Sequence, residues 1–227
     1  VARVERLANR LGWPGIAAGI LSLAVVVVVG VADGGVFPRT WRLGASALFA
    51  VAGAALLARA RVAVGRLELA AVVALGAFAI WIGLSALWGG NVSQAERALL
   101  YVAAMLAPLV LAERRAVPHL LGGSLAAITL VTGYGLSVYL FTSPPPDQFQ
   151  GSLLYQPLGY ANALGIFVAI GLLLAIGLAS AARGRAARAA WLAPCLVLAP
   201  ALLMTSSRGA WASFVVGLAA LALLRGD

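Results

Sequence analysis

The chain has 227 residues, of which 63% are hydrophobic and only 10% are charged. A soluble domain carries about 25% charged residues, so this composition excludes a water-soluble globule. The net charge of +9 comes from short arginine clusters between apolar runs, a pattern that indicates membrane topology and not nucleic-acid binding. One cysteine and one histidine give no pattern for a disulfide or a metal site, and we expect no cofactor.

Eight apolar segments follow one another along the chain and predict an all-α fold, a polytopic transmembrane helical bundle of about eight spanning helices. The segments are expected at roughly 13–31, 41–58, 67–88, 98–112, 120–141, 158–180, 189–205 and 210–224. A spanning helix needs about 20 apolar residues, so the fourth and eighth segments are short. No soluble domain fits between the segments, and we therefore expect residues 1–227 to form a single transmembrane domain.

The distribution of arginine predicts the orientation in the membrane. With the N-terminus in the cytoplasm, 12 of the 16 basic residues lie inside and four lie outside, which agrees with the positive-inside rule. The four outer residues are Arg39, Arg42, Arg97 and Arg208. Both termini are then cytoplasmic, and the chain is expected to be a multi-pass protein of the cytoplasmic membrane, with membrane lipids as neighbours.

Prolines predict two local features. Three consecutive prolines in the outer loop 142–157 favour an extended, solvated conformation, because proline cannot continue a helix. Pro194 and Pro200 fall inside the seventh segment and are expected to kink it.

The segment TSSRGAW at 205–211 predicts an anion-binding group on the outer side. Ser206 or Ser207 can cap the last helix, whose leading amides carry partial positive charge. The guanidinium of Arg208 adds a forked cation suited to phosphate or pyrophosphate. Gly209 would allow a ligand to approach the backbone, and Trp211 could stack on a sugar. The alternative is a snorkelling interfacial arginine beside an ordinary helix cap.

A second polar segment, PLGYANALG at 157–165, enters the sixth helix from the outer loop. Asn162 lies in its first turns, where an amide is unfavourable unless it is hydrogen-bonded. One interpretation is contact of Tyr160 and Asn162 with a polar headgroup or a glycan. The other is a hydrogen bond between helices.

These two motifs resemble the O-antigen ligase and O-antigen polymerase superfamily of bacterial membrane proteins. TSSRGAW is similar to the family's S/T-R-G/A-A-W step, and PLGYANALG is similar to its glycine–aromatic–Asn stretch. LWGGNVSQAER at 87–97 resembles a weaker family pattern, and the resemblance spans about 84–224. It implies a metal-independent transferase that moves a glycan from an undecaprenyl-pyrophosphate carrier to an acceptor on the outer side. Arg208 then matches the arginine that engages the pyrophosphate, and Asn162 helps to shape the cavity.

The chain departs from the family at its C-terminal end. The family carries further Arg and His residues in a large outer loop, whereas the one histidine here, His119, is expected on the cytoplasmic side. Catalytic residues are therefore not assigned. We expect the chain to be the N-terminal part of a longer protein and to be inactive in glycan transfer by itself.

Two other classes of function stay open. A small-solute or anion transporter is compatible with kinked helices and an outer arginine, although such proteins place polar residues at mid-membrane and show internal symmetry. A non-catalytic membrane scaffold would tolerate replacement of Arg208. The sequence does not decide between ligation and polymerisation, nor does it identify the glycan, the acceptor or the oligomeric state.

Overall fold

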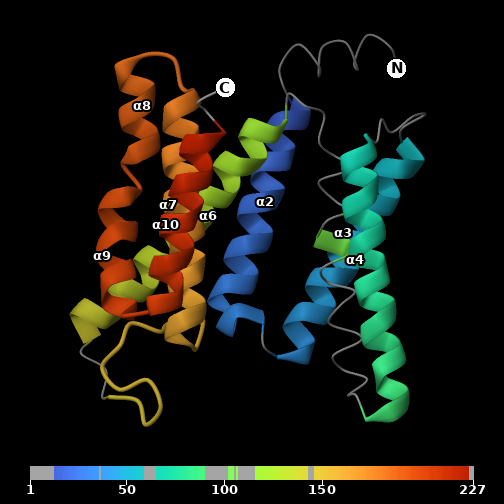
Figure 1. The fold of residues 1–227 in the computed structure, drawn as a ribbon, viewed down its shortest axis with the longest axis horizontal. Coiled ribbons are helices and arrows are strands. Elements are labelled where there is room, and N and C mark those ends of the chain that lie inside the picture. Colours follow the sequence, from blue (N-terminus) through green and yellow to red (C-terminus); the bar gives the residue numbers. More distant parts are fainter. Residues whose placement is uncertain are drawn as a thin grey trace. The chain divides into compact units, whose positions relative to one another are not determined.

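The computed structural model describes residues 13–35, 37–58, 65–89, 102–104, 106, 116–142 and 146–224. These residues form eight α-helices, two short 3-10 helices and no β-strand, so the predicted all-α class is confirmed for them (Figure 1). The α-helices are α2 (Trp13–Val31), α3 (Pro38–Ala58), α4 (Arg66–Ser85), α6 (Val117–Thr142), α7 (Ala161–Ala181), α8 (Arg185–Leu192), α9 (Cys195–Thr205) and α10 (Arg208–Leu223). The 3-10 helices are η1 (Asp33–Gly35) and η2 (Ala86–Trp88).

Most of the predicted apolar segments have a helical counterpart, with one difference. The seventh segment, which Pro194 and Pro200 were expected to kink, is divided into α8 and α9 by a turn at residues 193–194. Pro200 lies inside α9, and a kink at this residue stays a prediction. Of the fourth segment, 98–112, only residues 102–104 and 106 are described, and these are helical; most of the 87–97 pattern falls outside the described residues.

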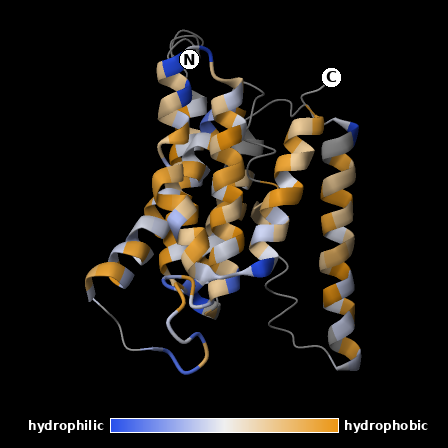
Figure 2. Cartoon of the chain, turned by 60° about the vertical axis from the view of Figure 1, so that its left-hand side comes forward, coloured by the Kyte–Doolittle hydropathy of each residue, from blue (hydrophilic) through white to orange (hydrophobic). Residues whose placement is uncertain are grey.

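Within the described residues, three helical stretches are long and apolar enough to cross a membrane. They are Val117–Thr142, Ala161–Ala181 and Arg185–Thr205. Shorter apolar helices cover Gly15–Val31, Leu69–Ser85 and Arg208–Leu223. Figure 2 shows hydrophobic residues along these helices and hydrophilic residues mainly near helix ends and connections. The structure is thus compatible with a membrane protein, while about eight spans with cytoplasmic termini stay a prediction.

The chain divides into two compact units, Val1–Ala18 with Gly35–Val117 and Gly19–Gly34 with Pro118–Asp227. In the first unit, α3 buries Trp41, Ala45, Leu48 and Ala52. This spacing of three and four residues places all four side chains on one helix face.

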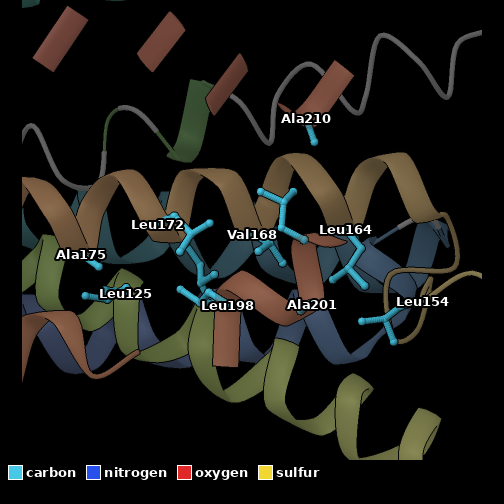
Figure 3. Packing of buried hydrophobic residues seen from close by; sticks show 11 residues of the cluster. Leu125, Leu154, Leu164, Val168, Leu172, Ala175, Leu198, Ala201 and Ala210 are labelled. Carbon is cyan, nitrogen blue, oxygen red and sulfur yellow. The ribbon is translucent and has the colours of Figure 1, made fainter. Parts of the chain in front are cut away.

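The second unit is held together by a core that joins α6, α7, α9 and α10. Leu125, Leu164, Val168, Leu198 and Ala210 are each at most 1% exposed and belong to this core (Figure 3). On its other side α6 packs closely against α2, where Ser22 Oγ and Ser124 Oγ are 2.7 Å apart. Small side chains thus allow close helix packing, as expected for helices that lack a polar surface.

The connections between the helices of the second unit lie at its two opposite ends. The loop between α6 and α7 lies at the same end as the turn between α9 and α10, and the connection from α7 to α8 lies at the opposite end (Figure 1). From α6 to α7, from α7 to α8 and from α9 to α10 the chain reverses its direction, whereas α9 continues in the direction of α8 (Figure 1). The two polar motifs are consequently brought to one end of this unit.

Candidate functional site

The two motifs meet at Gly165, in the first turns of α7. A Cβ at this position would lie 2.8 Å from Cβ of Ser207, 2.9 Å from Cβ of Ala210 and 3.0 Å from Oγ1 of Thr205. Only a glycine allows the α9–α10 turn to approach α7 so closely. The order of the motifs in the sequence does not reveal this contact, which joins them into one site.

Ser207 is the residue that caps α10. Ser206 ends α9 in the left-handed conformation, with φ of 49°, and the extended backbone of Ser207 follows it. The Ser207 hydroxyl accepts a hydrogen bond from N of Ala210 at 3.3 Å. Of the two serines considered from the sequence, Ser207 is therefore the cap, and it is only 2% exposed.

Arg208 begins α10 with an exposed side chain. Among the residues that the structure describes, its guanidinium has no hydrogen bond or ion pair. A Cβ at Gly209 would meet only open space, so a ligand can reach the backbone at this point. Trp211 is 38% exposed and packs edge-to-face against Phe214, with ring centroids 6.3 Å apart. The start of α10 thus offers a cation and accessible backbone.

Asn162 forms a local hydrogen bond. Its Nδ2 donates to the hydroxyl of Tyr160 at 2.7 Å, so the expected partner exists. It does not come from another helix, and the interpretation of a hydrogen bond between helices is wrong for this contact. Tyr160 is 50% exposed and Asn162 is exposed as well. The pair therefore presents polar atoms outward at the start of α7.

The prolines predicted an extended, solvated loop, and two of the three lie outside the described residues; the described part of the loop between α6 and α7, residues 146–160, is packed against helix ends. Leu154 is 1% exposed, and its backbone N donates to the carbonyl oxygen of Met204 at 3.1 Å. Oε1 of Gln150 accepts from N of Ala161 at 3.0 Å and so caps α7 from within the loop. The loop is held against the ends of α7 and α9 because these helix termini present backbone groups that need partners.

A tight turn precedes these contacts. Oδ1 of Asp147 accepts from N of Phe149 at 2.7 Å and from N of Gln150 at 2.8 Å. Asp147 and Gly151 also exchange two backbone hydrogen bonds, of 3.0 and 2.9 Å. This turn leaves Phe149 89% exposed and directs Gln150 to α7. Sequence reasoning missed both Gln150 and Leu154, since neither belongs to a local capping pattern.

The cap can be tested by the substitution Ser207→Ala. Loss of the side-chain acceptor leaves a buried N–H of α10 without its partner, which costs about 1 kcal/mol. We expect a lower midpoint in thermal unfolding of the purified protein, followed by circular dichroism. Ser213→Ala, at an exposed position of the same helix, is the matched control and is expected to leave the midpoint unchanged. An equal effect of the two substitutions would contradict the capping role.

The described residues contain no group of three or more His, Cys, Asp or Glu that could hold a metal ion. Comparison with protein-family models, curated proteins and solved structures finds no match. The functional interpretation therefore depends on the residues of the site and on the motif resemblance.

Proposed function

We propose that the protein is a membrane glycan ligase or polymerase that takes a glycan from an undecaprenyl-pyrophosphate carrier and transfers it to an acceptor. The observation that supports this most is the contact at Gly165, which assembles the two family-like motifs at one end of the second unit. The same end carries Arg208, exposed at a capped helix N-terminus.

The chemistry assigned to this end is stabilisation of a leaving pyrophosphate. When an acceptor hydroxyl attacks the anomeric carbon, the bond from that carbon to the pyrophosphate oxygen breaks and negative charge grows on the phosphate. The guanidinium of Arg208 and the leading N–H groups of α10 interact more strongly with that charge than with the intact substrate. The proton of the acceptor must pass to a base that we do not assign to any residue of this site.

The proposed setting is the outer face of the cytoplasmic membrane. The three helical stretches long enough to cross a membrane belong to the same unit as the site. With the N-terminus in the cytoplasm, the arginine-rich connection from α7 to α8 faces the cytoplasm and the Arg208 end faces outward. Tyr160, Asn162 and Trp211 are then positioned to contact the sugar next to the pyrophosphate.

An anion transporter is the second candidate, and one feature favours it. No acidic residue occurs between Asp147 and Asp227, so Arg208 has no carboxylate near it in the sequence. An exposed arginine of this kind would also attract a small anion.

The test is glycan transfer by the full-length protein in membrane vesicles supplied with a lipid-linked glycan. We expect wild-type protein to form the transferred product and Arg208→Gln to reduce the rate by about a hundredfold, the usual effect of removing one transition-state donor. Arg208→Lys keeps the charge but loses the forked geometry of the guanidinium, so its transfer rate should lie between those of the wild type and Arg208→Gln. Uptake of a labelled anion without any transfer would favour the transporter and refute the transferase.

A further inference from the structure

Three arginines cluster where α7 passes into α8. Arg183 lies in the turn, Arg185 is the first residue of α8 and Arg188 lies one helical turn further on, all with exposed side chains. Nε of Arg188 donates to the carbonyl oxygen of Ala182 at 3.2 Å, which holds its guanidinium beside the turn. The connection from α7 to α8 is at the opposite end of the unit from the start of α10 (Figure 1). The cluster is thus separate from the site around Arg208.

No acidic side chain from this part of the sequence neutralises the cluster. Between Asp147 and Asp227 the sequence contains arginines but neither Asp nor Glu. Neighbouring guanidinium groups repel one another, and an anion beside them relieves this repulsion. Charge complementarity therefore favours an anionic partner for the cluster.

The helix that carries the arginines also has little protein around it. Only 17% of the 18-residue apolar stretch within Arg185–Thr205 is buried, whereas 44% of the corresponding stretch within Ala161–Ala181 is buried. Leu196, in the following α9, is 81% exposed, whereas the ring of Trp191 packs close to Gly122 of α6. In a membrane such an exposed apolar helix faces lipid, and arginines at its end reach the level of the headgroups.

We propose that Arg183, Arg185 and Arg188 bind the phosphate headgroups of anionic phospholipids. Arginine suits this partner because its planar fork of donors matches phosphate oxygens. The aliphatic chains of the lipid would lie along the exposed apolar surface of α9. This inference depends on the membrane placement proposed above but not on glycan transfer.

The test compares lipids that remain bound to the purified chain, measured by native mass spectrometry after exchange into equal amounts of phosphatidylglycerol and phosphatidylcholine. We expect the wild type to retain phosphatidylglycerol preferentially. Arg183→Gln with Arg185→Gln should reduce that retention by about thirtyfold, given the usual contribution of each arginine near an anionic surface. Arg188 is left intact because its hydrogen bond to Ala182 supports the turn. Replacement of the same pair by lysine should keep most of the retention.

The matched control is Arg39→Gln with Arg66→Gln, which removes the same charge from exposed positions of α3 and α4. It should change retention by less than about twofold if the cluster is a local site, because neither residue belongs to the cluster. An equal loss in this control would show that net charge alone matters and would overturn the proposal. Unchanged retention in the variant with glutamine at 183 and 185 would also overturn it. Displacement of the lipid by millimolar glycerol phosphate would identify a soluble phosphate ligand and refute the lipid site.

Discussion

Replacing Gly165 by alanine is expected to destabilise the protein by about 1–3 kcal/mol, the usual effect of overpacking a buried site. The new methyl group would lie within 3.0 Å of Ser207, Ala210 and Thr205. Two of the three contacting atoms are Cβ atoms, which cannot move without their backbone. Relief of the clash therefore requires the α9–α10 turn to move away from α7, and we expect a lower midpoint in thermal unfolding in detergent.

Gly177→Ala provides the matched control in the same helix. A Cβ at Gly177 would have Leu221 as its nearest neighbour, at 4.0 Å, so there is room for the methyl group. Because alanine favours a helix over glycine by about 1 kcal/mol, this variant should be at least as stable as the wild type. If Gly165→Ala were equally stable, the close contact between the two motifs would be refuted.

Replacing Gly135 by alanine is expected to have an effect of similar or greater size. A Cβ at this position of α6 would overlap the backbone carbonyl group of Gln156 and would approach Pro157. Backbone atoms cannot rotate out of the way, so the segment that leads into α7 must be displaced. We expect a loss of about 2–3 kcal/mol in unfolding free energy together with faster proteolysis of the loop that precedes α7.

The control for this variant is Gly133→Ala, two positions earlier in α6. Its Cβ would lie 3.7 Å from Cγ1 of Val197, an ordinary van der Waals distance. For this variant we expect neither a lower unfolding midpoint nor faster proteolysis of the loop. A Gly135→Ala protein that matched this control in both measurements would contradict the docking of the loop on α6.

Apolar run length was sufficient to predict the helical segments of the second unit, because segments that cannot be solvated must form helices to satisfy their backbone groups. A serine cap at Ser206 or Ser207 also followed from local sequence, since capping involves residues only a few positions apart, and the structure identifies Ser207 as the cap. A distortion of the seventh segment at Pro194 was predictable for the same reason, and the turn at residues 193–194 lies there.

Contacts between distant residues could not be predicted in this way. The sequence marked Gly165 as part of a motif, but only the packing of α7 against the α9–α10 turn shows why a side chain is excluded there. Similarly, Gln150 caps α7 from within a loop, and no spacing rule links it to Ala161. The three prolines suggested solvation of the loop, yet Leu154 is buried and its backbone N donates to the carbonyl oxygen of Met204 at the end of α9.

The most direct test of the proposed site is the affinity of the purified 227-residue chain for undecaprenyl pyrophosphate, measured by its protection against thermal unfolding. Binding to the folded state alone raises the midpoint as ligand concentration increases. We expect protection of the wild type and about ten- to hundredfold weaker binding by Arg208→Gln, since a charged hydrogen bond contributes about 1.5–3 kcal/mol. Arg183→Gln, at the opposite end of the unit, should bind like the wild type. Equal protection of the wild type and Arg208→Gln, or none for either, would contradict the assignment of Arg208 to the pyrophosphate.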